Sequence, residues 1–277
     1  MPQIKLVLND IDGVFGKFKK PDYPAQQEIE PYKQGLDAIK NVIAEHLQKG
    51  VVHGACTGRA FHSIEPVMIH TGINAPSVFE HGTWIWIPGK GGYRLVDKEF
   101  PNLIEISNQL ESWIRSFDDK QLFSHFPNVD MIRRRHENTH ILTYEFLGAT
   151  AAQVYEQLEK LMPQHIRDGI ANGALRKILS ESEIDGKPTG AIDIMPNVHK
   201  DQGVKHVIKL MGLQKEDVLG IEDSFHSGIP LLQECGQVAG PGNAQDKLKD
   251  YIKQRGGFIA SQNYADGWVE IMKHFFS

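Results

Sequence analysis

Cysteine is scarce in this chain, and its scarcity excludes two classes of protein. Only Cys56 and Cys235 are present among 277 residues, far apart and in segments typical of an interior strand or a strand edge. Such a pair provides neither the disulfide framework of a small secreted domain nor the cysteine spacing of a structural zinc site. We expect two reduced, buried thiols.

Long apolar runs and an excess of one charge are also lacking. No run approaches the roughly 20 residues that span a bilayer, and the first residues, MPQIKLVLND, lack a signal core with a cleavage site. The net charge is −5, and the 30 basic residues are spread along the chain. We therefore expect a cytoplasmic protein that binds neither membrane nor nucleic acid, whereas a small anionic partner is compatible with this composition. The oligomeric state is left open.

The hydrophobic pattern indicates an α/β protein, and 40% hydrophobic residues suffice for a substantial core. An apolar run, Ile4 to Leu8, is typical of a buried parallel strand and ends at Asn9-Asp10. Apolar residues at helical spacing follow between 36 and 47, and a second apolar run covers Val51 to Cys56. This order predicts a βαβ unit, in which ligands bind at the carboxyl ends of the strands.

The pattern changes in the middle of the chain. Residues 88–188 alternate helical and strand-like segments in the manner of an α+β insert, and the turn DGKPTG closes it. The strand-like segment AIDIMP and the helices after it indicate a return to the first pattern. We predict a doubly wound parallel sheet built from residues 1–87 and 189–277, with residues 88–188 as an inserted α+β cap domain.

Two carboxylates directly follow the first predicted strand, in the segment NDIDGV. Asp10 and Asp12 leave the strand end together, and Gly13 permits a tight backbone turn. Two close acids raise one another's pKa unless a cation or a donor compensates. The pair therefore suggests either a divalent metal site or an acid/base dyad.

The second strand is followed by ACTGRA. Here Thr57 and Gly58 precede a helix, so a hydroxyl and backbone amides face the position where a helix N-terminus binds an anion. A phosphate cradle and a simple helix N-cap both fit this segment.

Further along the chain, a lysine and two more acids stand at equivalent places. Lys200 begins a helix, where the helix dipole disfavours a cation, so a role in neutralising a phosphate and a carboxylate would explain its position. Lys187 is a rival candidate for this role. Glu222 and Asp223 end another apolar strand. Together with Asp10 and the backbone carbonyl of Asp12, Asp223 would complete an oxygen-only magnesium site.

Two other segments have two interpretations each. The run Arg133 to Arg135 precedes a strand in the insert and forms either a solvated face or a surface that meets a phosphorylated substrate. The loop GPGNA, at 240–244, either approaches the site or is a plain tight turn.

In order and spacing, four of these segments resemble the four motifs of the haloacid dehalogenase superfamily. They are Asp10 to Val14, Thr57 to Arg59, Lys200 and Asp223, and VFEHGTWIW, GPGNA and YADGW are supporting matches. The insert resembles the type II cap of the Cof-like subgroup, which includes sucrose-phosphate and mannosyl-3-phosphoglycerate phosphatases. The resemblance covers nearly the whole chain.

This resemblance implies a magnesium-dependent phosphatase that acts on a small phosphorylated metabolite, most simply a sugar phosphate. Asp10 would be the nucleophile, Asp12 the general acid and base, Thr57 a phosphate ligand and Lys200 the compensating cation. The candidate substrate-binding residues are Gly13, Gly58, Arg59, Arg133 and Arg135. The candidate metal ligands are Asp10, Asp12, Asp223 and Ser227.

One motif departs from the family pattern. The fourth motif usually carries a second acid, whereas here the segment reads EDSFHSG and Ser227 occupies the approximate place of that acid. Two alternatives to a phosphatase therefore stay open: a phosphomutase or phosphotransferase that uses the same phosphorylated aspartate, and a phosphosugar-binding protein with weakened catalysis.

Overall fold

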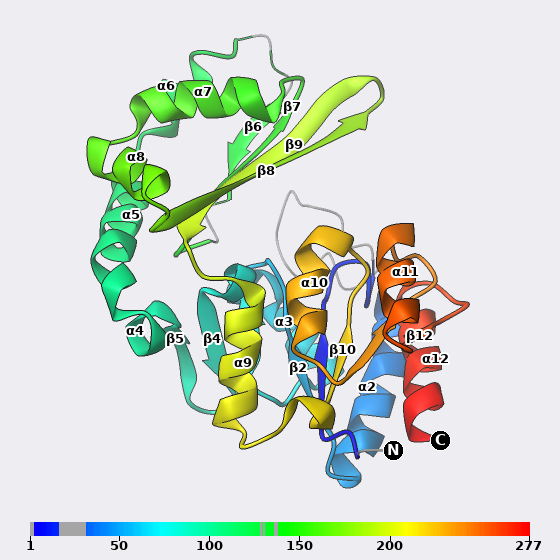
Figure 1. Cartoon of the computed structure of the whole chain (residues 1–277). Helices are drawn as coiled ribbons and strands as arrows, with labels where there is room; N and C mark the ends of the chain where they lie inside the picture. The colour runs from blue at the N-terminus through cyan, green and yellow to red at the C-terminus, as the bar shows by residue number, and fades with distance from the viewer. Residues whose placement is uncertain (1–2, 17–31, 128, 130, 136–137) are drawn as a thin grey trace. The chain divides into compact units, whose positions relative to one another are not determined.

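The structure, a computed structural model, describes residues 3–16, 32–127, 129, 131–135 and 138–277. It divides into two compact units (Figure 1). The core unit consists of the residues up to Tyr93 and from His199 to Ser277, and the inserted unit is Arg94–Val198. Each unit is described by itself below.

A parallel sheet forms the centre of the core unit. Within the described residues it has five strands in the order β12-β11-β10-β1-β2, and every neighbouring pair is parallel. The strands are β1 (Leu6–Asn9), β2 (Val52–Ala55), β10 (Val218–Ile221), β11 (Gln237–Gly240) and β12 (Phe258–Ile259). All four residues of β1 are buried, as expected for a central parallel strand that is covered on both faces. The predicted doubly wound sheet is confirmed.

Helices flank this sheet in the order that the sequence predicts. They are α2 (Lys33–Gln48), α3 (Phe61–Thr71), α9 (Lys200–Leu210), α10 (Phe225–Gln233), α11 (Asp246–Gln254) and α12 (Tyr264–Phe276). One hydrophobic cluster joins α2, α3 and α12 to alternate residues of the strands, among them Val7 and Leu219. Because side chains alternate along a strand, Asn9 points to the same face as Val7 and meets Trp268 of α12 there, 2.7 Å from oxygen to indole nitrogen.

A small antiparallel sheet continues the core unit. Its strands are β3 (Ser77–Phe79), β4 (Trp84–Ile87) and β5 (Gly91–Arg94), and a single parallel bridge joins Cys56 to Val78. A short 3-10 turn, Glu80–Gly82, links β3 to β4 with left-handed backbone at every residue, at φ 47°, 56° and 108°. Non-glycine residues seldom adopt this conformation, so the first two positions of the turn are strained.

The inserted unit is an antiparallel sheet with helices on one face. The sheet order is β6-β7-β9-β8, with strands β6 (Met131–Arg134), β7 (Leu142–Leu147), β8 (Leu175–Ile184) and β9 (Lys187–Pro196). The helices are α4 (Val96–Glu99), α5 (Ile104–Ser116), α6 (Asp119–Phe123), α7 (Ala151–Leu161) and α8 (Gln164–Ala171). Alternate residues of β7 and β9, such as Tyr144 and Ile192, form the hydrophobic cluster with these helices.

One strand differs from its expected place. AIDIMP was expected to reopen the parallel sheet, but it belongs to β9, which pairs with β8 over ten residues in the inserted unit. The turn at Asp185-Gly186, left-handed at both residues, turns the chain back on itself, and the alternation of Ile192 and Ile194 buries them against the helices of this unit. The structural division accordingly falls at 93/94 and 198/199 rather than at 87/88 and 188/189.

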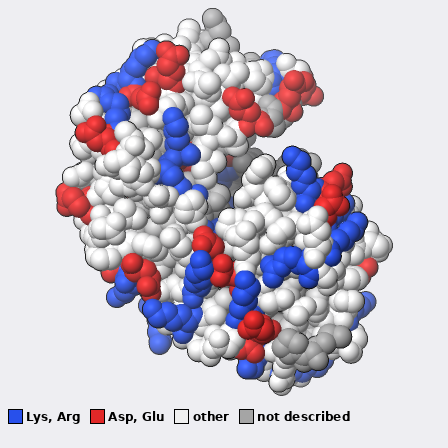
Figure 2. Space-filling view, in the orientation of Figure 1, with Lys and Arg blue, Asp and Glu red and all other residues white. Residues whose placement is uncertain are grey.

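Among the described residues, no helix is both long and apolar enough to cross a bilayer. Basic and acidic side chains are interspersed on the face that Figure 2 shows.

Candidate active site

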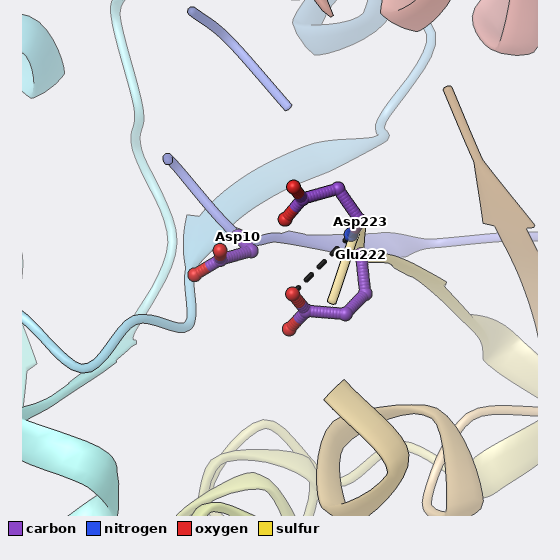
Figure 3. Close-up of side chains that lie close together, drawn as sticks. All are labelled: Asp10, Glu222 and Asp223. Carbon is purple, nitrogen blue, oxygen red and sulfur yellow. Dashed lines mark hydrogen bonds between the residues drawn. The ribbon is translucent and has the colours of Figure 1, made fainter. Parts of the chain in front are cut away.

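The candidate site lies at the carboxyl ends of three neighbouring parallel strands of the core unit. Asp10 follows β1, Thr57 follows β2 at one remove, and Glu222 and Asp223 follow β10. Because β1 lies between β2 and β10, the sheet brings these residues to one edge. Figure 3 shows that Asp10, Glu222 and Asp223 gather there from two strands.

Asp10 is held at the centre of this edge. Its backbone N–H donates to the carbonyl of Ile221, 2.9 Å away, and its carboxylate lies 3.5 Å from the ammonium of Lys200. Burial raises the pKa of Asp10 well above its usual value, the Glu222 carboxylate adds to that rise, and Lys200 opposes it. Nearby cations keep such a buried carboxylate ionised, as a nucleophile must be. The same cations would offset the negative charges on the oxygens of a phosphoryl group and so favour attack on its phosphorus.

Lys200 lies beside these acids at the start of α9. Its ammonium lies 3.1 Å from Glu222 Oε2, and its side chain is 4% exposed. Burial alone would lower the pKa of Lys200, but the carboxylates of Asp10 and Glu222 raise it above its usual value. Lys200 therefore stays charged at the start of α9.

Glu222 is a site residue to which the sequence analysis gave no role. Its side chain is fully buried, and its second oxygen accepts from the backbone N–H groups of Asp223 and Ser224, both at 3.3 Å. The signal available in the sequence was its place directly after an apolar strand, beside Asp223. The glycine at 228 is required for it, since a Cβ there would lie 1.9 Å from Glu222 Cγ.

Asp223 completes a cluster of three acids. One oxygen from each of Asp10, Glu222 and Asp223 lies within 4.8 Å of the other two. Burial and the carboxylates of Asp10 and Asp12 raise the pKa of Asp223 to about 7. Mutual repulsion of this kind among hard oxygen donors is what a divalent cation such as Mg²⁺ relieves, so the donor set fits the predicted metal.

Gly13 lies against Asp223 in a backbone conformation that favours glycine. Its φ is +76°, and a Cβ there would be 1.9 Å from Asp223 Oδ2. This contact keeps the turn after Asp12 close to the acid cluster. The predicted role of Gly13 in binding substrate stays a prediction.

Asp12 is bound by Arg59 in a two-pronged ion pair. The guanidinium Nε and Nη2 donate to the two carboxylate oxygens at 2.6 and 2.7 Å, and the side chain of Arg59 is 7% exposed. Such forked pairing fixes both position and orientation of a carboxylate. The guanidinium of Arg59 thus lies on Asp12, and the predicted role of Arg59 in binding substrate stays a prediction.

The turn at Thr57 and Gly58 adjoins the strained turn of the small sheet. Thr57 is buried and its hydroxyl accepts from the N–H of Arg59 at 3.3 Å, which is a local turn contact. The ring of His81 packs on Gly58, where a Cβ would lie 2.4 Å from the ring. His81 had no role in the sequence analysis, and no pattern in the sequence marked its left-handed backbone apart from the glycine that follows it.

The remaining predicted residues lie in other surroundings. Ser227, at the start of α10, shares a hydrogen bond of 2.5 Å with the hydroxyl of Ser224. Arg135 belongs to the inserted unit, where it is buried and donates to Glu145 at 2.8 Å. The side chain of Arg133 lies outside the described residues. The metal role of Ser227 and the substrate roles of both arginines stay predictions.

A model of the haloacid dehalogenase-like hydrolase family matches residues 30–272. The chain therefore belongs to this family of hydrolases, and the resemblance inferred from its motifs is confirmed.

Individual relatives cover nearly the whole chain. A phosphoglycolate phosphatase of Sulfolobus acidocaldarius is 24% identical over 273 residues, which is 98% of this chain and 96% of that protein. The fold is shared with the solved structure of a Thermoplasma acidophilum protein, at 17% identity and a TM-score of 0.63, over 99% of this chain and 98% of the other. It is also shared with a sucrose-phosphatase of Synechocystis, solved with sucrose and phosphate, at 16% identity and a TM-score of 0.58, over 99% and 98%.

Proposed function

We propose that this protein is a magnesium-dependent phosphatase that hydrolyses a small phosphorylated metabolite through a phosphorylated Asp10. The observation that supports this most is the cluster of Asp10, Glu222 and Asp223 with the buried Lys200 at the carboxyl ends of the strands. It combines a nucleophile, a fixed cation and donors for a divalent metal. Family membership and a full-length phosphatase relative favour the same reaction.

The proposed mechanism begins with attack of an Asp10 oxygen on the substrate phosphorus. Asp12 enters this step as a carboxylic acid that keeps one of its two bonds to Arg59, and it protonates the leaving oxygen. As the resulting carboxylate, paired again with Arg59, it later takes a proton from the water that hydrolyses the phosphorylated Asp10. Lys200 offsets negative charge on Asp10 and on the transferring phosphoryl group.

The metal would be held by Asp10, Asp223 and the backbone carbonyl of Asp12. Glu222 would lie beside the metal while it stays paired with Lys200. When bound, Mg²⁺ would supply charge stabilisation for the phosphoryl oxygens. Thr57 and the amide of Gly58, in the turn that precedes α3, are the proposed phosphate ligands.

The substrate class follows from two observations that differ. The inserted segment resembles the cap of a subgroup that includes sucrose-phosphate phosphatases, which favours a sugar phosphate as the substrate. The full-length relative, in contrast, bears the name of a phosphoglycolate phosphatase. We propose a sugar phosphate as the first candidate and phosphoglycolate as the second. Both are small phosphate monoesters, so the same residues would carry out the reaction.

The test is phosphate release from a panel containing hexose phosphates, sucrose phosphate, phosphoglycolate and an aryl phosphate, with Mg²⁺ or with a chelator. We expect turnover only with Mg²⁺, and we expect Asp10→Asn to remove it while circular dichroism shows an intact fold. Transfer of the phosphoryl group to an added hydroxyl acceptor would identify a phosphotransferase instead. Ligand binding without any turnover would identify a binding protein and contradict the proposal.

A further inference from the structure

The loop at 241–245 connects β11 to α11 and contains most of the GPGNA segment. Sequence alone left two interpretations of this segment, an approach to the site or a plain turn. The structure favours the first, because two of its residues, Asn243 and Gln245, bind backbone groups of the segments that carry the site acids.

Asn243 bridges two backbone groups with its side-chain amide. Its Nδ2 donates to the carbonyl of Gly13 at 2.8 Å, and its Oδ1 accepts from the N–H of Tyr264 at 2.8 Å. One partner is an acceptor and the other a donor, so only one orientation of the amide satisfies both. Asn243 thus links the turn after Asp12 to the first residue of α12.

Gln245 makes the matching contacts with the other acidic segment. Its backbone N–H donates to the carbonyl of Asp223 at 2.8 Å, and its side-chain oxygen accepts from the N–H of Phe225 at 2.8 Å. The loop therefore binds the Asp223 segment on one side and the Gly13 segment on the other.

These two segments also touch each other, since Gly13 leaves no room for a Cβ beside Asp223. Two sets of contacts thus fix the position of the Gly13 segment relative to the Asp223 segment. One is the direct contact between the two segments, and the other is the hydrogen bonds that each makes with the loop. The loop itself is held by close packing, because a Cβ at Gly242 would lie 2.8 Å from three oxygens of residues 261–263.

We propose that Asn243 is a positioning residue, which holds the Gly13 carbonyl so that Asp12 and Asp223 keep the separation that the reaction needs. The inference rests on the proposed phosphatase function. Catalytic groups that shift by a fraction of an ångström lose rate while substrate binding is largely kept. Loss of the Asn243 contact should therefore lower kcat more than it raises KM.

The experiment compares Asn243→Asp and Asn243→Ala with the wild type. The aspartate variant keeps the acceptor for Tyr264 but replaces the donor by an oxygen that repels the Gly13 carbonyl. The alanine variant loses both contacts without adding charge. Asn172→Asp is the charge-matched control, because Asn172 is exposed and uses its oxygen to accept from Ala174 at 3.0 Å, a contact that the carboxylate keeps.

Two readouts are measured: hydrogen–deuterium exchange of residues 10–16, and kcat and KM for the best substrate. We expect both Asn243 variants to speed exchange in this segment and to lower kcat about tenfold, with KM changed less than threefold and Asn172→Asp like the wild type. Unchanged exchange in both variants overturns the inference, whatever happens to kcat. A wild type without phosphate release contradicts the proposed function instead, and the exchange comparison still decides the role of Asn243.

Discussion

Replacing Lys200 by methionine would leave two buried carboxylates without the lysine that lies beside both of them. Lys200 lies 3.1 Å from Glu222, which is fully buried, and 3.5 Å from Asp10. Removing one partner of a buried ion pair typically destabilises a protein by about 3–5 kcal/mol, because the other charge stays in a medium that solvates it poorly. Methionine fills a similar volume, so this loss is mainly electrostatic.

The loss in free energy of unfolding should depend on pH, and the direction of this dependence follows from the pKa values of the carboxylates. Burial already raises the pKa of both Asp10 and Glu222, and removal of Lys200 raises both further. The folded variant then binds more protons than its unfolded chain, so its stability decreases as pH rises. At pH 8 we expect a loss of about 3–5 kcal/mol, which shrinks toward zero as pH falls and protons neutralise the acids, by at most about 1.4 kcal/mol per carboxylate and pH unit.

The assay is urea unfolding at pH 5.5 and pH 8, with a chelator present so that no metal replaces the lysine charge. Lys205→Met is the control, since Lys205 is 55% exposed and pairs with Asp201 on the same helix at 3.0 Å. An exposed pair of this kind contributes about 0.5 kcal/mol or less. A loss for Lys200→Met that is equal at the two pH values, or no larger than that of the control, would refute the reasoning.

Three further predictions follow from single contacts. Arg59→Lys should lower kcat about tenfold or more with little change in KM, because an ammonium cannot reproduce the two parallel hydrogen bonds that the guanidinium donates to Asp12. Steady-state kinetics on the folded variant checks this, and an unchanged kcat contradicts it. Gly13→Ala should lower the rate of phosphate release about 100-fold or more, because the φ angle at Gly13 is +76° and the new Cβ would clash with Asp223. Activity near that of the wild type would show that this turn moves freely. His53 is fully buried, and its burial and the neighbouring His46 lower its pKa to about 3. The folded state therefore keeps His53 neutral, and stability should be lost as pH falls from about 6.5 toward 3, by up to about 4–5 kcal/mol. Urea unfolding over this range should show a flatter curve for His53→Gln, and identical curves would rule out His53 as the cause.

The parallel sheet and the place of the site could be predicted from local pattern. Residues 4–8 are apolar and end in acids, and a strand buried on both faces allows few other sequences. A cation at a helix start made Lys200 a candidate beside Lys187, the family resemblance favoured Lys200, and the structure places two carboxylates beside it. Signals of this kind are local, so a single sequence contains them.

What escaped prediction depends on contacts between distant segments. AIDIMP alternates as a core strand would, and only its pairing with β8 shows that it belongs to the inserted unit. The partner of Arg59 is 47 residues away, and nothing near Arg59 in the sequence distinguishes a bond to Asp12 from one to a substrate. The role of Asn243 likewise depends on Gly13, at the other end of the chain.

The charges at the site account for the unusual fourth motif. Asp12 is balanced by Arg59, and Lys200 offsets one of the three clustered acids, Asp10, Glu222 and Asp223. Two negative charges then remain when all groups are ionised, which one divalent cation would balance. An acid at 227, where the family pattern carries one, would add a negative charge near the start of α10, on the segment that follows Glu222 and Asp223, whose carboxylates already have raised pKa values. A neutral serine at 227 avoids this further charge, and Glu222 is a carboxylate that Lys200 contacts directly.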